Sequence, residues 1–253
     1  MEFEEPQRVT FENLSRLPGL VHGVFTRHGG VSAPPYQSLN VAWNNGDLPD
    51  AVRENLKRVK MSLGLEWLVS TPQVHGDVLN FIRAAQGLED RGGVLLAPPG
   101  DALATNSTGL GLLIKVADCQ SILLADPQSR IIANIHSGWR GSVANIAGKT
   151  VKHLERLGLN TRKTVAGISP SLGPCCAEFI NYEREIPEEF WRFRVGPVHF
   201  DFRAISRWQL RAAGLAEENI EVAAKCTVCE RADYFSYRGE GETGRLASVI
   251  GWK

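Results

Sequence analysis

The sequence predicts an α/β sandwich built on mixed β-sheets, and three observations support this fold class. Short apolar runs of strand length follow one another between residues 67 and 137. Two longer segments, 50–64 and 138–158, carry apolar residues at the three- to four-residue period of a helix with one buried face. The order of these elements is too irregular for a doubly wound parallel fold, so we expect mixed sheets.

The first expected elements are a strand and a helix. The segment GLVHGVFTRHGG alternates apolar and small residues before a Gly-Gly turn, which predicts a strand ending near Thr26 and Arg27. Residues 50–64 begin with Asp50, which we expect to cap a helix, and end at a glycine. The predicted buried face of that helix consists of Val52, Leu56, Val59 and Leu63.

The remaining elements follow in quick succession. Consecutive strands are predicted from five apolar runs, WLVSTPQV, DVLNFIR, GLGLLIKVAD, QSILLADP and RIIANIHS. Residues 138–158 predict a helix directly after the last of these strands. Beyond it, KTVAGIS, IEVAAKC and RLASVIGW predict strands, and EIPEEFWRF and AISRWQLRAAG predict helices. Because no repeat or long linker interrupts the chain, we expect one domain spanning residues 1–253.

Composition narrows the partners and the compartment. Of 253 residues, 43% are hydrophobic, and Lys+Arg and Asp+Glu both number 28, so no net charge favours nucleic acid or an acidic membrane surface. The acidic start MEFEEPQRVTF lacks a secretory pattern and no apolar run is long enough to span a membrane, so we expect a cytoplasmic protein. An odd number of cysteines, five, favours buried, reactive or metal-bound thiols over a disulfide framework.

Three potential metal ligands stand at the ends of predicted strands: His75, Cys119 and His136. If the fold brings them together, two imidazoles and one thiolate make a three-ligand site with an open position, as catalytic zinc requires. Copper can also bind this mix of ligands. Two alternatives stay open on spacing alone. The three residues can be a buried cysteine and two ordinary hydrogen-bonded histidines, or Cys119 can be a nucleophile with a histidine as its base.

Neighbouring residues suggest further roles. Asp118, directly before Cys119, can orient a ligand, a water or a catalytic histidine. Arg140 falls at the start of the helix predicted after His136, where backbone amides attract anions, although an arginine there is more often a solvated surface residue. The other cysteines are Cys175 and Cys176, which are adjacent, and the pair in Cys226-Thr-Val-Cys229. Because adjacent cysteines rarely direct both sulfurs at one ion, we expect these four thiols to be buried near the site rather than to form a second metal site.

Taken together, several motifs resemble one family in their order along the chain. They are TRHGGVS, SLNVAWNNGD, QVHG, DALAT, ADCQSILLAD, HSGWRG, GISPSLGPCC and FSYRGEGETGRLASVIGW. This series is similar to that of the YfiH-like laccase-domain family, whose members have been called multicopper polyphenol oxidase, peptidoglycan editing factor and purine nucleoside phosphorylase. The similarity extends from about Val21 to Trp252. Many members have ADCVP where this chain has ADCQS, so Gln120 changes the pocket wall or adds a hydrogen bond.

The resemblance implies a four-layer α/β/β/α sandwich and a zinc ion held by His75, Cys119 and His136, with copper as the alternative metal. It also implies phosphorolysis of adenosine, inosine and methylthioadenosine, and deamination of adenosine by a water that the zinc activates. The expected catalytic residues are the three ligands and Asp118. The expected contacts to purine nucleoside and phosphate are Arg27, Asn40, Arg140 and Arg238. A monomer or weak homodimer is expected.

Three other functions remain in competition. A copper-dependent polyphenol oxidase is disfavoured, because a multicopper centre needs about ten histidines with His-x-His pairs, whereas this chain has six histidines and no such pair. A hydrolase acting on peptidoglycan precursors could use Cys119 or the zinc. A metal-binding protein without turnover would show a fourth protein ligand.

Overall fold

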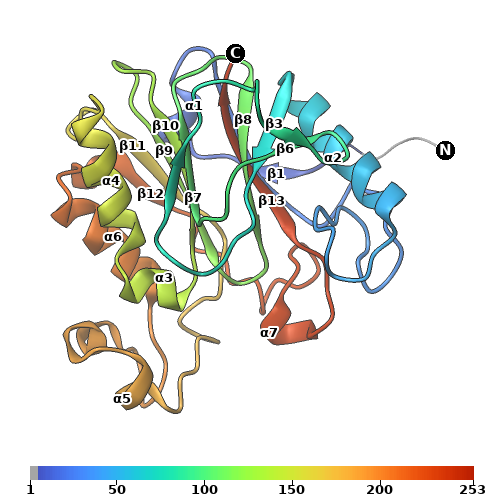
Figure 1. Ribbon diagram of the computed structural model, residues 1–253. Coiled ribbons are helices and arrows are strands. Elements are labelled where there is room, and N and C mark those ends of the chain that lie inside the picture. Colours follow the sequence, from blue (N-terminus) through green and yellow to red (C-terminus); the bar gives the residue numbers. More distant parts are fainter. Residues whose placement is uncertain (1–4) are drawn as a thin grey trace.

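The computed structural model describes residues 5–253, so the first four residues of the acidic N-terminal stretch lie outside the described part. Two β-sheets pack face to face between helices (Figure 1). One sheet has the strand order β1 (Arg8–Val9), β2 (Leu20–Phe25), β13 (Leu246–Trp252), β8 (Leu110–Val116), β3 (Trp67–Ser70), β6 (Val94–Leu96) and β5 (Glu89–Asp90). The other has the order β12 (Ile220–Val222), β11 (Val165–Ile168), β9 (Gln120–Ala125), β10 (Ile132–Ser137), β7 (Ala102–Thr105) and β4 (Leu79–Phe81).

Both sheets are mixed, as the sequence predicts. In the first, β3 runs parallel to β6 and β8, whereas β13 runs antiparallel to β2 and β8. In the second, the central strands are antiparallel, and β12 and β4 join the two edges in parallel pairs. No helix of the described residues is long and apolar enough to cross a membrane.

Helices cover the outer face of each sheet and complete the four-layer α/β/β/α arrangement (Figure 1). Helix α2 (Pro49–Leu63) packs on the seven-stranded sheet. Helices α3 (Trp139–Val143), α4 (Ile146–Arg156) and α6 (Phe202–Ala212) lie on the side of the six-stranded sheet. The two-residue period of a strand explains how one strand serves two cores: Leu123 faces the other sheet, and its neighbours Ile122 and Leu124 face the helices.

Two of the predicted helices differ in the structure: the first begins one residue earlier than expected, and the second is divided into two helices. Helix α2 begins at Pro49 after Leu48, so Asp50 lies inside the first turn and does not cap the helix. The predicted helix 138–158 is divided into α3 and α4, because Asn145 adopts a left-handed conformation with a φ of 57°. Its side chain accepts a hydrogen bond from the Gly148 N–H and thereby caps α4. The spacing of apolar residues predicts one continuous helix, whereas the Asn145 cap begins a second helix within that segment.

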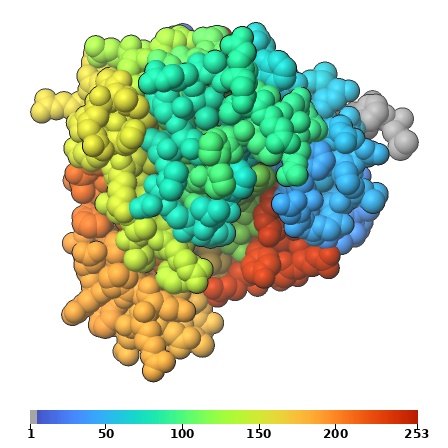
Figure 2. All heavy atoms as spheres, in the orientation of Figure 1, coloured from blue at the N-terminus to red at the C-terminus, as the bar shows by residue number. Residues whose placement is uncertain are grey.

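The segment after β11 also departs from the prediction. Instead of one helix over 185–193 it contains α5 (Tyr182–Glu185) and the 3₁₀-helix η1 (Glu188–Phe193). Aromatic residues that include Phe179, Phe190 and Phe200 form a small core of their own there. Figure 2 shows this segment as a lobe that projects from one end of the molecule. Three further short helices complete the chain: α1 (Glu12–Ser15), η2 (Glu217–Asn219) and α7 (Tyr237–Glu240).

Candidate metal centre

His136 is the last-but-one residue of β10 and is buried. Its Nδ1 lies 2.8 Å from Oδ1 of Asp101, which leaves Nε2 as the ring nitrogen that a metal could bind. A carboxylate on one imidazole nitrogen fixes the tautomer and the ring orientation, and it makes the other nitrogen a better ligand. The position at the end of β10 therefore suits a metal ligand whose ring is oriented by the Asp101 carboxylate.

Asp101 holds a second segment of the site as well. The same carboxylate accepts the backbone N–H groups of His75, at 2.9 Å, and Gly76, at 2.7 Å, in the loop that follows β3. His75 has a φ of 59°, a left-handed conformation that these bonds stabilise. The Asp101 side chain is fully buried. Residue-by-residue reasoning on the sequence missed this role, although the DALAT motif that begins at Asp101 was the available signal.

Cys119 lies in the tight turn between β8 and β9, preceded by Asp118 with a φ of 84°. The structure brings its sulfur together with ring nitrogens of His75 and His136, all within 4.8 Å of one another. The two imidazole rings meet edge to face, with centroids 4.8 Å apart and an interplanar angle of 82°. Gly138 lines the same space, because a Cβ there would come within 2.9 Å of the Cys119 sulfur.

The charges of this group are strongly perturbed. Burial opposes ionisation of Cys119, but hydrogen bonds and positive charge from His136 and His75 outweigh it and lower the pKa of the thiol to about 6. Burial likewise opposes protonation of His136, but its bonds to Asp101 and to the Cys119 sulfur raise its pKa to about 9. A thiolate and an imidazolium thus face each other near neutral pH. A divalent cation can replace the proton between them.

The donor set fits a metal ion. Two imidazole nitrogens and one thiolate are ligands typical of zinc, and three protein ligands leave a position for a reacting group. Of the residues that the structure describes, no fourth His, Cys, Asp or Glu side chain joins this cluster. The chain therefore has a possible Cys/His metal site with the donor pattern of a catalytic centre.

Two cavities meet at this cluster. The larger one, of about 620 Å³, is of ligand-binding size and exposes all three side chains. Its walls carry three basic residues, Arg91, Lys115 and Arg245. The smaller one, of about 170 Å³, shares Cys119 and is lined largely by apolar and aromatic side chains. They are Trp139, Leu172, Phe179, Phe202 and Tyr237, with Gln120 beside them.

Two of the expected substrate contacts are used elsewhere in the fold. The Arg27 guanidinium binds two carbonyl oxygens and pairs with Glu240 at 2.9 Å, and it lines neither cavity. Asn40 is fully buried, and its amide bonds within the loop around Asp47 and with the N–H of Arg245. Both residues therefore stabilise segments near the site and do not line either cavity.

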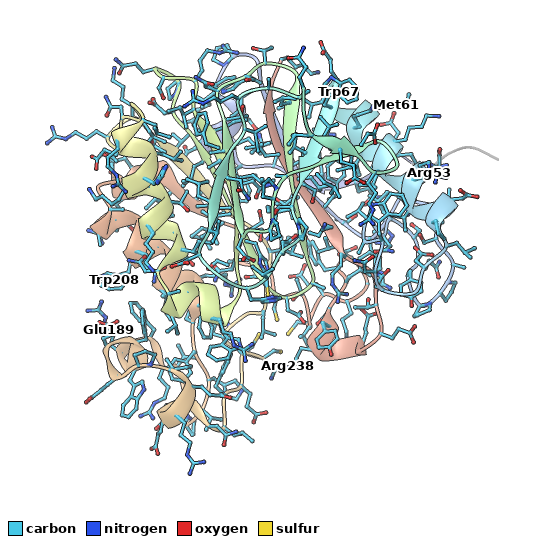
Figure 3. The ribbon with its side chains drawn as sticks, viewed as in Figure 1. Arg53, Met61, Trp67, Glu189, Trp208 and Arg238 are labelled. Carbon is cyan, nitrogen blue, oxygen red and sulfur yellow. The ribbon has the colours of Figure 1, made fainter. Side chains whose placement is uncertain are left out.

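Of the other predicted residues, Arg238 and Asp118 line the smaller cavity, and Arg140 lines neither cavity. Arg238 lines the smaller cavity, and Figure 3 shows it at the lower end of the molecule beside α7. Arg140 is exposed and stacks over Trp139 with 4.5 Å to the ring centroid, on a helix of only five residues. The Asp118 carboxylate accepts three hydrogen bonds, from Thr227, Ser236 and the N–H of Arg238, and so organises that loop. Sequence reasoning missed Lys115 and Arg245, whose neighbours in the chain carry no recognisable anion-binding pattern.

The chain is similar to known proteins over its whole length. A purine nucleoside phosphorylase of Deinococcus radiodurans is 34% identical over 251 residues, which cover 94% of this chain and 92% of that protein. The solved structures of YlmD from Geobacillus stearothermophilus and of the hypothetical protein YfiH from Bacillus licheniformis superpose with TM-scores of 0.86 and 0.85, at 31% and 28% identity. Each covers 100% of this chain, and 98% of each neighbour is covered.

A family model described as multi-copper polyphenol oxidoreductase laccase matches residues 21–253. That range contains both sheets except for β1 and Leu20, the first residue of β2, and it contains every residue of the candidate metal centre. The chain therefore belongs to this YfiH-like laccase-domain family.

Proposed function

We propose that this protein is a zinc-dependent purine nucleoside phosphorylase. In this reaction a phosphate oxygen attacks C1′ of the nucleoside, the C1′–N9 bond breaks, and the base leaves with the bonding electrons and takes up a proton. The proposed substrates are adenosine, inosine and methylthioadenosine, with adenosine deamination as a second activity. Relatives that match nearly the whole chain carry the name purine nucleoside phosphorylase, which supports the reaction class.

The observation that carries the proposal is the positive charge beside the His/Cys cluster. Lys115 and Arg245 line the same cavity as His136, in a chain whose net charge is zero. Burial lowers the pKa of Lys115 to about 8, so the amine is still mostly charged at neutral pH. Its Nζ lies 3.1 Å from Oγ of Ser70, and the Arg245 guanidinium binds the carbonyls of Thr243 and Gly244. Two cations held in this way suit a phosphate dianion.

The smaller cavity suits a purine ring. Its aromatic walls offer stacking surfaces, and Gln120 supplies a polar group at their edge. The Gln120 Nε2 donates to the carbonyl of Phe202 at 3.1 Å, whereas the buried Oε1 has no partner among the described residues. We assign Gln120 to the wall that surrounds the base, and we expect Gln120→Leu to raise KM for the nucleoside more than KM for phosphate.

The metal would be held by His75, Cys119 and His136. When bound, zinc supplies Lewis acidity at the reacting centre and a route to an activated water for deamination. Asp101 keeps the His136 ring in one tautomer and holds the backbone of His75 in place. Burial of His136 and Asp101 keeps water away from the back of the site.

The decisive experiment incubates zinc-loaded protein with inosine, adenosine or methylthioadenosine, with and without inorganic phosphate. Release of free base and a ribose 1-phosphate only in the presence of phosphate supports phosphorolysis, and conversion of adenosine to inosine without phosphate supports deamination. His136→Ala should abolish both activities. His153→Ala, on the exposed face of α4, is the matched control and should keep both. If the unmodified protein leaves all three nucleosides intact, the proposal is wrong.

A copper-dependent phenol oxidase is the second candidate, because the family model carries that description. Among residues 5–253, the cluster of His75, Cys119 and His136 is the one group of potential ligands that contains histidine. An oxidase would therefore have to work with copper in this same site. Metal analysis of protein produced without added copper, followed by a phenol oxidation assay before and after copper loading, separates the two functions.

A further inference from the structure

Four cysteines that the proposed reaction does not use converge in a second group. Cys175 and Cys176 lie in the turn that follows β11, and Cys226 and Cys229 lie in the loop that follows β12. Strands β11 and β12 are parallel neighbours, so the loops that follow them begin at the same end of the sheet. Backbone bonds continue beyond the strands, with the N–H of Thr227 donating to the carbonyl of Ser171 at 3.1 Å.

The sulfur positions contradict the expectation from sequence that these thiols are simply buried. Cys226 is buried, but Cys175 and Cys229 are exposed. The Cys229 sulfur lies 3.6 Å from the sulfurs of both Cys175 and Cys176, and all four sulfurs lie within 4.8 Å of one another. The turn explains how adjacent residues can point at one place, because the N–H groups of Cys176 and Ala177 both bond to the Gly173 carbonyl.

This spacing fits a tetrahedral metal site. Four sulfurs, each about 2.3 Å from a zinc ion, stand about 3.8 Å from one another. A disulfide needs about 2.05 Å and joins only two sulfurs. The Cys229 sulfur lies 3.6 Å from both the Cys175 and the Cys176 sulfur, which is close to the spacing of ligands around one shared ion.

The backbone around the group supports thiolates. The N–H of Gly173 donates to the Cys226 sulfur at 3.3 Å. Gly173 is required there, because a Cβ would lie 2.9 Å from Cβ of Cys226 and 3.2 Å from the Cys175 sulfur. The mostly buried Arg203 guanidinium packs beside the same glycine and bonds to the carbonyls of Ala223 and Lys225. Its positive charge offsets the negative charge of a zinc ion with four thiolates.

We propose that Cys175, Cys176, Cys226 and Cys229 bind a structural zinc ion that joins the loops after β11 and β12. With four protein ligands the site is closed, unlike the three-ligand centre beside the cavities. Thr227, between two of the ligands, donates to the Asp118 carboxylate at 2.7 Å, and Asp118 directly precedes Cys119. The ion therefore braces the loop that carries Tyr237 and Arg238 to the smaller cavity.

The test measures zinc in the full chain with His75→Ala and His136→Ala, which removes two ligands of the candidate metal centre. After purification under reducing conditions from zinc-supplemented medium and desalting, this variant should retain about one zinc per chain. Adding Cys175→Ser and Cys229→Ser, both at exposed positions, should remove it. A zinc-free double-histidine variant overturns the proposal, as does zinc content that is unchanged by the serine substitutions.

Cobalt binding gives a second readout that does not depend on the folding of the serine variants. Co²⁺ added to the reduced double-histidine variant should produce the intense visible and near-ultraviolet absorption of tetrahedral thiolate coordination. Zinc should displace it and protect the four thiols from iodoacetamide. Absence of these bands, or a chain mass that lacks two hydrogens because two of the cysteines have formed a disulfide, overturns the proposal. Because these readouts require no nucleoside turnover, they stand apart from the outcome of the phosphorylase assay.

Discussion

Asp101→Asn tests whether a single buried carboxylate organises the metal centre. Oδ1 of Asp101 accepts hydrogen bonds from His136 Nδ1 and from the His75 N–H, and Oδ2 accepts the N–H of Gly76 at 2.7 Å and of Val74 at 3.3 Å. Asparagine replaces one of these two acceptor oxygens with an NH₂ group. Whichever way its amide is turned, this NH₂ group faces N–H donors that bond to the carboxylate in the unmodified protein.

The magnitude follows from the number of groups left without partners. One or two of these donors lose their acceptor at about 1–3 kcal/mol each, so the free energy of unfolding should fall by about 1–6 kcal/mol. For a chain of this length that loss corresponds to a decrease in Tm of about 2–24 °C. Loss of the charge behind His136 should weaken zinc binding by about 10- to 100-fold, the usual effect of removing a group that orients a metal ligand.

The assay pairs calorimetry for Tm with competition against a chromophoric chelator for zinc affinity. Both use metal-free protein that carries Cys175→Ser and Cys229→Ser, so that zinc binds only at the candidate metal centre. Asp126→Asn is the matched control, because Asp126 is also fully buried and accepts backbone N–H groups, from Gln128 and Asn160, at the opposite end of β9. The control should lose stability and keep its zinc affinity. If Asp101→Asn binds zinc within about twofold of the unmodified protein, the carboxylate does not organise the site.

Three further predictions concern separate parts of the molecule. Burial lowers the pKa of Lys115 to about 8, so the amine loses its charge as pH rises through that value and KM for phosphate should rise there. Lys115→Arg should move this rise to higher pH, because arginine keeps its charge. A pH profile that does not move argues against phosphate binding by Lys115. Gly138→Ala places a Cβ 2.9 Å from the Cys119 sulfur and should weaken zinc binding by about tenfold or more, whereas Gly196→Ala, with open space around it, should have no effect on a chelator titration. Burial lowers the pKa of His22 from 6.5 to about 4, so the folded protein favours the neutral imidazole. This preference contributes roughly 3 kcal/mol to the free energy of unfolding above pH 6.5, and the contribution is lost as pH falls toward 4. In urea unfolding measured between about pH 4 and 7, His22→Gln should therefore lose less stability on acidification than the unmodified protein.

Much of the fold could be predicted from local patterns. The buried face of α2 contains Val52, Leu56, Val59 and Leu63 as the helical period indicates, and the apolar runs around β8, β9 and β10 are strands. Short edge strands such as β5 and the single-turn helices were missed, because two to four residues carry too little periodicity to be distinguished from a loop. The break at Asn145 was missed because it depends on a capping bond and not on hydrophobicity.

By itself, the sequence determined the layers of the fold, the family, and three residues whose chemistry suits a metal. Those properties depend on local periodicity and on motifs of a few adjacent residues. Only the tertiary structure decided that Asp101 stands behind His136, that Asn40 and Arg27 are occupied within the walls, and that Lys115 and Arg245 face the cavity. It also placed the sulfurs of Cys175 and Cys229, more than fifty residues apart, 3.6 Å from each other. Such contacts depend on how strands are paired across two sheets, and no short segment of the chain contains that information.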